Sequence, residues 1–125
     1  MLQFPDSYFE DEVRDGFYVP SMIKRAWATA LDVLCEVDRI CCKYNIKYYA
    51  QWGTLLGAVR HAGFIPWDDD LDIGMMRTDY RKFCQVAPKE FKKGFQIFTF
   101  NTQKDFHHFL ARVVCKNRIC FEDEH

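Results

Sequence analysis

Apolar residues between positions 23 and 44 recur at alternating intervals of four and three, the spacing of one face of an α-helix. Ser21 precedes this stretch and is a favoured residue for capping a first helical turn, while Asn45 is a suitable residue to end it. Because charged residues occupy the other faces, we expect a long amphipathic helix whose apolar face packs against a sheet. That face consists of Ile23, Trp27, Ala30, Leu34, Val37, Cys41 and Tyr44.

The remaining chain alternates short strand-like and helix-like segments. Strands are predicted at 46–51, 70–73, 95–100 and 109–115, with a partner strand beginning at 119–121, and shorter helices at 55–61 and from 78 or 79 to Pro88. This order predicts an α/β (α+β) fold, a mixed sheet flanked by helices. Residues 1–12 are acidic and are expected to form a loosely held leader before one domain at 13–125.

Composition narrows the function classes. The net charge is −1, so the 125-residue chain has no bulk attraction to nucleic acid, and 49% hydrophobic residues suffice for a core. The sequence shows neither a secretory signal nor an apolar stretch long enough to cross a bilayer, so we expect a cytoplasmic protein without a transmembrane segment. Peripheral association with a membrane stays open. The six cysteines lack metal-site spacing and are expected to be free thiols.

Four aspartates fall within the five positions 68–72, directly after Gly63-Phe64-Ile65-Pro66-Trp67. Like charges this close repel, and a bound cation is the simplest way to neutralise them. In a strand at 70–73, Asp70 and Asp72 project from one face, while the alternating apolar residues enter the core. Carboxylate oxygens suit Mg²⁺ or Mn²⁺. A solvated acidic turn is the competing interpretation, and the apolar alternation favours the metal site.

Gly53 and Thr54 stand between a predicted strand and a predicted helix, one short helix before the aspartates. Glycine permits close approach of a ligand to the backbone, and a helix N-terminus favours anions such as phosphate. Alone, this turn is weak evidence for a phosphate site, because capping a helix is the commoner role of such a threonine. Beside a carboxylate pair, however, a phosphate cradle is the arrangement that phosphoryl or nucleotidyl transfer needs.

Other polar residues near this turn admit two roles each. Arg60 can bind phosphate through two hydrogen bonds or can form an ion pair with Asp68 or Asp69. His61 can donate to phosphate or move a proton, or it is a loop histidine with satisfied hydrogen bonds. Arg77 can contact substrate or cap the acidic strand. For Trp52, base stacking and core packing are both open.

The segments 53–61 and 63–74, followed by Arg77 and Asp79-Tyr80, resemble the LicD family. This family includes bacterial phosphocholine transferases and is related to fukutin-related protein. The resemblance extends less sharply through the preceding helix and through 111–121. It implies a nucleotidyltransferase-like fold, a glycine-plus-hydroxyl turn at Gly53 and Thr54, and a metal-binding D-x-D pair at Asp70 and Asp72. Gly53, Thr54, Arg60, His61, Asp69 and Arg77 are the candidate substrate contacts.

The implied reaction moves phosphocholine, or a related phosphoalcohol, from CDP-choline or a similar CDP-alcohol to a cell-surface glycan such as teichoic acid or lipopolysaccharide. An acceptor hydroxyl attacks the phosphorus attached to choline, CMP leaves, and Mg²⁺ or Mn²⁺ clamps the diphosphate. Two alternatives are a nucleotidyltransferase that moves the NMP itself and an inactive nucleotide-binding module. Product analysis and binding measurements separate the three.

One departure from the family pattern concerns a third carboxylate, which the superfamily site normally carries on a later strand. The expected Ile-Asp-Ile-Phe-Pro-like segment is missing from this sequence. Glu122, Asp123 and Glu124 lie too close to the end to be assigned to this role. We therefore expect a domain that is incomplete at its C-terminus and that is inactive by itself if the missing acid is essential.

Overall fold

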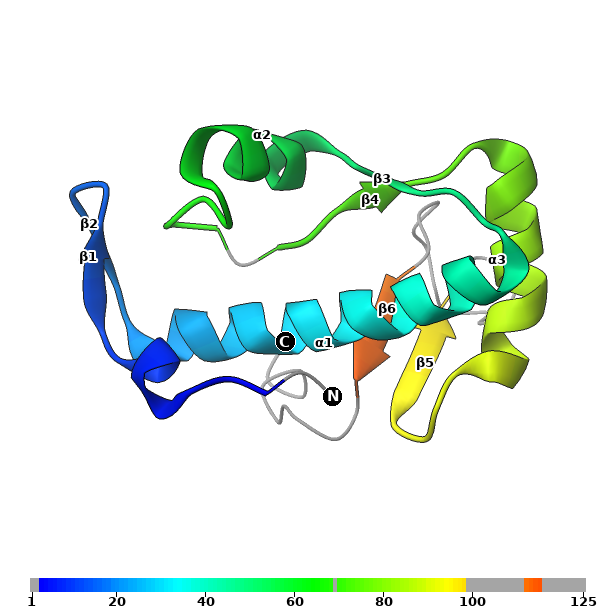
Figure 1. Cartoon of the computed structure of the whole chain (residues 1–125), viewed down its shortest axis with the longest axis horizontal. Coiled ribbons are helices and arrows are strands. Elements are labelled where there is room, and N and C mark those ends of the chain that lie inside the picture. Colours follow the sequence, from blue (N-terminus) through cyan, green and yellow to red (C-terminus); the bar gives the residue numbers. More distant parts are fainter. Residues whose placement is uncertain (1–2, 69, 99–111, 116–125) are drawn as a thin grey trace.

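The computed structural model describes residues 3–68, 70–98 and 112–115 (Figure 1). The elements in chain order are the 3₁₀ turn η1 (Asp6–Phe9), β1 (Glu12–Arg14), β2 (Phe17–Val19), α1 (Ser21–Tyr44), β3 (Tyr49–Ala50), α2 (Trp52–His61), β4 (Ile73–Gly74), α3 (Arg77–Glu90), β5 (Phe95–Phe98) and β6 (Arg112–Cys115). Helices and antiparallel strand pairs together confirm the α+β class. Within these ranges the strands form three separate two-stranded sheets, β1–β2, β3–β4 and β5–β6, and not one mixed sheet.

The long helix is α1, and its predicted extent is confirmed. Asn45 ends it with a left-handed backbone (φ 55°), and the N–H groups of Asn45 and Ile46 both donate to the carbonyl of Cys41. The prediction that Ser21 caps the first turn is wrong. Ser21 is the first helical residue, and its own N–H donates to the Asp11 carboxylate at 2.6 Å. A side chain from outside the helix therefore satisfies one of the orphan N–H groups of α1.

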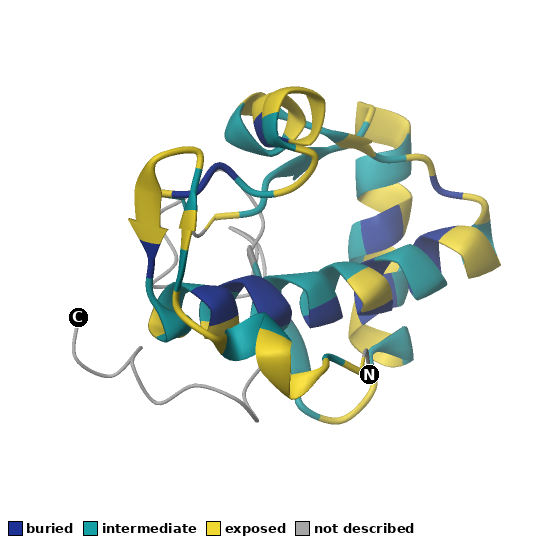
Figure 2. Cartoon of the chain, turned by 60° about the vertical axis from the view of Figure 1, so that its left-hand side comes forward, coloured by how far each residue is buried: buried dark blue, intermediate teal, exposed yellow. Residues whose placement is uncertain are grey.

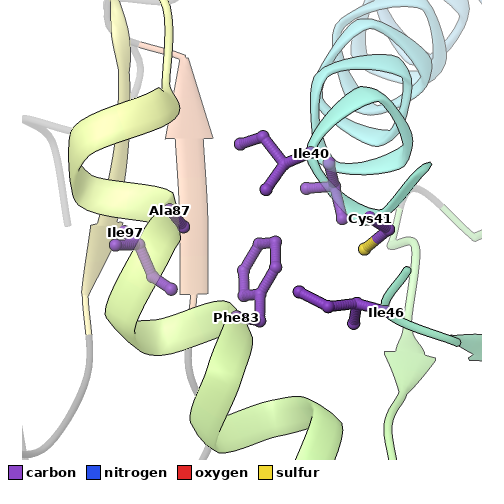
Figure 3. Close-up of a cluster of buried hydrophobic side chains, with 7 residues drawn as sticks. Ile40, Cys41, Ile46, Phe83, Ala87 and Ile97 are labelled. Carbon is purple, nitrogen blue, oxygen red and sulfur yellow. The ribbon is translucent and has the colours of Figure 1, made fainter. Parts of the chain in front are cut away.

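The main core lies where the second half of α1 meets α3 and β5. Figure 3 shows the Phe83 ring between Ile40 and Cys41 of α1 on one side and Ile97 on the other. Phe83 is 4% exposed, so its burial is worth roughly 1.5–3 kcal/mol. The prediction of a sheet under the whole apolar face of α1 is wrong for its first half, because Trp27 stacks on Phe64 in the loop after α2.

A hairpin at the start of the chain was not predicted. β1 and β2 pair in register Glu12↔Val19, and the two-residue turn between them is Asp15-Gly16, both with positive φ (53° and 79°). An Asp-Gly pair is a strong signal for such a turn. The hairpin extends beside α2 at the N-terminal end of α1 (Figure 1).

The observed bounds of several other elements differ by a few residues from the predicted ones. The helix predicted from 55 begins at Trp52, and the one predicted to stop at Pro88 runs from Arg77 to Glu90, with Pro88 in its last turn. The acidic strand predicted at 70–73 is wrong for its first three residues, since β4 contains only Ile73 and Gly74. The strand predicted at 119–121 lies outside the described residues. None of the described helices is long and apolar enough to span a membrane.

Candidate functional site

The short β3–β4 pair brings the glycine turn and the acidic segment together. Tyr49 pairs with Gly74 and Ala50 with Ile73, and the Gln51 N–H then donates to the Asp72 carbonyl at 3.1 Å. The site is tight at Gly74: a Cβ there would lie 2.6 Å from the Gln51 amide and 2.7 Å from the Tyr49 ring, so these side chains would have to move to admit it. Backbone pairing therefore fixes where Asp72 stands relative to the start of α2.

Thr54 contacts the acidic segment directly. Its hydroxyl oxygen accepts a hydrogen bond from the Asp72 N–H at 2.6 Å. The threonine does not cap α2, whose preceding residue is Gln51, and the Thr54 N–H itself donates to the Gln51 carbonyl at 3.1 Å. With its oxygen engaged, the Thr54 hydroxyl can still donate one proton to a ligand.

Gly53 faces another aspartate, Asp68. A Cβ at Gly53 would lie 2.8 Å from Asp68 Oδ2, so the Asp68 carboxylate occupies the space beside this glycine. The other carboxylate oxygen of Asp68 accepts the Asp70 N–H at 3.0 Å. Sequence reasoning left the direction of Asp68 open, and the structure places it between the glycine turn and the backbone of Asp70.

The first residue of α2, Trp52, has an unusual backbone conformation. Trp52 has φ 45°, a left-handed conformation that is rare for a bulky residue, and such outliers gather at functional sites. Its side chain is 64% exposed, so the core-packing interpretation of Trp52 is wrong. Near the start of α2, the N–H groups of Thr54 and Leu55 both donate to the carbonyl of Gln51, the residue that precedes the helix.

Arg60 and His61 lie at the opposite end of α2 from Gly53 and Thr54. His61 lies seven positions after Thr54 in α2, a rise of about 10 Å along the helix axis. His61 Nδ1 is 2.7 Å from Asp15 Oδ2 of the hairpin turn, and a pocket of about 290 Å³ is lined by Asp15, Arg60 and His61. Among the described residues Arg60 forms no ion pair, so the alternative pair with Asp68 is not observed, and the alternative partner Asp69 lies outside those residues.

Asp15 is the site residue that sequence reasoning missed. The Asp-Gly turn signal marks a hairpin but gives no indication of which distant residue the turn approaches. The Trp67 ring lies edge-to-face with the His61 ring, with the two ring centroids 6.0 Å apart, and the Phe17 ring of β2 lies 5.6 Å from the same tryptophan, again between centroids. The hairpin therefore contacts the last residue of α2 and the middle of the loop that follows it.

Of the remaining predicted site residues, the structure describes Arg77 but not Asp69. Arg77 is exposed and is the first residue of α3, directly after the β4 segment. Asp69 and the acidic residues at 122–124 lie outside the described residues. The structure thus joins Gly53, Thr54, Asp68, Asp70 and Asp72 into one cluster, which we call the acidic cluster, and separates Arg60 and His61 from it.

A divalent metal fits the oxygen-only donors of the acidic cluster. Within residues 3–68, 70–98 and 112–115, no three His, Cys, Asp or Glu side chains gather closely enough to hold a metal by themselves. Mg²⁺ is commonly bound through one or two carboxylates, with substrate phosphates and water completing its shell. Asp70 is exposed and Asp72 half-buried, so neither residue is enclosed in the core.

Comparisons with known proteins point in the same direction. The family model described as "LicD/FKTN/FKRP, nucleotidyltransferase domain" matches residues 45–120, a range that holds β3, α2, the acidic cluster and α3. No solved structure matches the chain.

Several curated proteins are similar over part of their length. The lipopolysaccharide cholinephosphotransferase LicD of Haemophilus influenzae is 42% identical over 69 residues, which cover 55% of this chain and 26% of that protein. An uncharacterised protein of Rickettsia typhi is 50% identical over 62 residues, 50% of this chain and 20% of the relative. The human ribitol 5-phosphate transferase FKRP is 47% identical over 46 residues, 37% of this chain and 9% of the relative. The matched region thus spans about a quarter or less of each relative.

Proposed function

Because the chain belongs to the family of LicD/FKTN/FKRP nucleotidyltransferase domains, we propose that it takes part in metal-dependent transfer of a phosphoalcohol. The donor is a CDP-alcohol such as CDP-choline, and the acceptor is a hydroxyl of a cell-surface glycan. The observation that carries the proposal is the hydrogen bond between Thr54 and the backbone of Asp72, which holds the start of α2 against the acidic segment.

The residues of the acidic cluster have distinct proposed roles. Gly53 lacks a Cβ, so a phosphate can approach the backbone at the start of α2, next to the Asp68 carboxylate. Asp70 and Asp72 are the proposed ligands of Mg²⁺ or Mn²⁺, which when bound offsets negative charge on a diphosphate. Thr54 positions Asp72 through the main chain and keeps one proton to donate.

The proposed step is a substitution at phosphorus. The acceptor hydroxyl loses its proton to solvent, and its oxygen forms a new bond to the phosphorus that carries the alcohol. The bond from that phosphorus to the bridging oxygen breaks, and CMP leaves with the electron pair. Phosphoalcohol transfer is favoured over NMP transfer because two of the similar proteins are named for moving choline phosphate and ribitol phosphate. The choice between choline and another head group, the glycan and a cytoplasmic location are parts of the proposal.

The test is release of CMP from CDP-choline, and in parallel from CDP-ribitol, with a glycan acceptor and Mg²⁺. We expect EDTA to stop the reaction. We expect Asp70→Asn and Asp72→Asn each to lower its rate by more than about 100-fold, because losing a ligand should exceed the 10–100-fold cost of losing its outer-shell partners. The matched control is Asp6→Asn, an exposed aspartate of η1. Unchanged CMP release in both cluster variants contradicts the proposal, and a nucleotidylated acceptor assigns the chain to NMP transfer instead.

An inactive nucleotide-binding module is the second candidate. It is favoured because, among the described residues, no three His, Cys, Asp or Glu side chains lie close enough together to hold a metal, although the cluster contains three aspartates. Calorimetric titration with CDP-choline and Mg²⁺ distinguishes it, since a module of this kind binds the nucleotide in an Asp70-dependent manner and releases no CMP.

A further inference from the structure

We propose that Trp27, in the first half of α1, is a positioning residue for the acidic cluster; the inference rests on the proposed function. Trp27 lies outside the residues 45–120 that the family model matches. Its indole Nε1–H donates to the main-chain carbonyl of Asp68 at 2.7 Å, a contact between residues 41 positions apart in sequence. A side chain that the family comparison leaves unassigned thus holds the residue at which the acidic segment begins.

The contact is built into the interior of the protein. Trp27 is 1% exposed, so its N–H cannot exchange this acceptor for water, and leaving a buried donor unpaired is costly. The indole also stacks on Phe64, with ring centroids 5.1 Å apart and planes within 3°. One side chain therefore fixes the loop after α2 at two positions, through stacking at Phe64 and through a hydrogen bond at Asp68.

From Asp68 the restraint reaches a proposed metal ligand. The Asp68 N–H donates to the Ile65 carbonyl at 2.9 Å, which closes a turn. The Asp68 carboxylate accepts the Asp70 N–H and lies beside Gly53. A shift of the Asp68 main chain thus also moves the carboxylate that accepts the Asp70 N–H. The main chain at Asp70 then loses this restraint on its position. The far end of the acidic segment is held separately, by Thr54 at Asp72.

The hairpin supports Trp27 in turn. The guanidinium of Arg14 lies 5.2 Å from the centre of the Trp27 ring, a cation–π distance. Glu12 bonds both Arg14 and the buried Lys24 at 2.6 Å, and these contacts lower the pKa of Glu12, with the Lys24 hydrogen bond as the main cause. The N-terminal part of the chain, which lies outside the matched family region, therefore contributes to the geometry of the acidic cluster.

The experiment measures binding of Mn²⁺ in the presence of CDP-choline by electron paramagnetic resonance, using the whole chain. Trp27→Phe keeps an aromatic ring for Phe64 and removes the N–H donor. We expect its Mn²⁺ affinity to fall about tenfold, the lower end of the effect of removing an outer-shell partner. The matched control is Phe83→Leu in the distant core, which lowers the unfolding temperature and leaves the Mn²⁺ affinity of the folded protein unchanged.

The outcomes separate the two proposals. If the natural chain binds Mn²⁺ and Trp27→Phe binds it equally well, Trp27 is a structural residue only and the inference is overturned. If the natural chain itself binds no Mn²⁺ with the nucleotide, the proposed metal site fails and takes the inference with it. If Trp27→Phe does not fold, Phe64→Leu takes its place, because it removes the stacking partner of Trp27. We expect Phe64→Leu to weaken Mn²⁺ binding, by less than tenfold. Unchanged Mn²⁺ affinity in this variant again overturns the inference.

Discussion

At the scale of residues, the acidic cluster depends on main-chain hydrogen bonds that side chains accept. Asp72 is held by the Thr54 hydroxyl, and Asp70 is held by the Asp68 carboxylate. Both acceptors engage the N–H groups of the proposed ligands and leave the carboxylates of Asp70 and Asp72 to other partners. This division suits a site in which the backbone must be rigid while the carboxylates bind a ligand.

Replacing Thr54 by valine tests this arrangement. The variant keeps the shape of the side chain and removes the acceptor of the Asp72 N–H, so we expect the free energy of unfolding to fall by about 1 kcal/mol. Mn²⁺ affinity should fall with it, whereas Thr54→Ser should keep both. Urea denaturation and Mn²⁺ titration provide the measurements.

Thr29→Val is the matched control for that substitution. The Thr29 hydroxyl donates to the Arg25 carbonyl within α1 in a solvent-exposed hydrogen bond, so its loss should change stability by less than about 0.5 kcal/mol. Equal behaviour of the Thr54 and Thr29 variants would show that the Thr54 hydroxyl has no special role.

The sequence predicted part of this cluster for a clear reason. Gly53 and Thr54 adjoin one strand and Asp72 adjoins another, so pairing of the two strands is enough to bring them together. The position of Asp68 was not predictable in this way. It depends on Trp27, 41 positions earlier, and no local pattern indicates which side chain meets the acidic segment.

At the scale of elements, a charged contact joins the end of α1 to the end of α3. Glu90 accepts hydrogen bonds from the Tyr44 hydroxyl at 2.6 Å and from Lys43 Nζ at 3.0 Å. The same contacts, the Tyr44 hydrogen bond first, lower the pKa of Glu90 from its ordinary value of 4.5. The two helices that enclose the core are thus also joined at its rim, where Phe91 follows α3.

This contact makes stability depend on pH in a defined direction. Because the folded pKa of Glu90 is below the unfolded value of 4.5, its contribution is fully present above pH 4.5 and is lost as the pH falls through the folded pKa. We expect Glu90→Gln to lower the unfolding temperature at pH 7. Below pH 4.5, we expect the unfolding temperature of this variant to fall less on acidification than that of the natural chain. Thermal unfolding between pH 3 and pH 7 measures this, with the exposed Glu10→Gln as control. Parallel pH profiles for the natural chain and Glu90→Gln would contradict the assignment.

Elements were predicted with unequal success because their signals differ in range. The periodicity of α1 persists over 24 residues, so its extent was predicted correctly. β3 and β4 have two residues each, too few for alternation to define a strand, and the acidic strand was accordingly predicted three residues too early. Whether strands join one mixed sheet or separate pairs depends on contacts between distant segments, which local patterns do not encode.

At the scale of the whole molecule, burial is unevenly distributed. The second half of α1, α3 and β5 share the main core, whereas α2 and the hairpin are largely exposed (Figure 2). The outer face of α2 carries four apolar side chains at positions i, i+3, i+4 and i+7, the spacing of a face that is normally buried. These are Trp52, Leu55, Leu56 and Val59, with exposed fractions of 64%, 50%, 55% and 78%.

This apolar face should be detectable in solution. Contiguous exposed apolar surface binds hydrophobic dyes and promotes association, so we expect the native chain to enhance the fluorescence of anilinonaphthalene sulfonate. Val59→Lys and Leu55→Lys should each reduce that enhancement without lowering the unfolding temperature, because both side chains are at least half exposed and lysine is a good helix former. The matched control is Val37→Ala in the core, which should lower the unfolding temperature and leave the dye signal of the folded protein in place. If neither lysine variant changes the dye signal, the dye binds a different surface. If either variant is much less stable than the natural chain, α2 packs more closely than its exposure indicates.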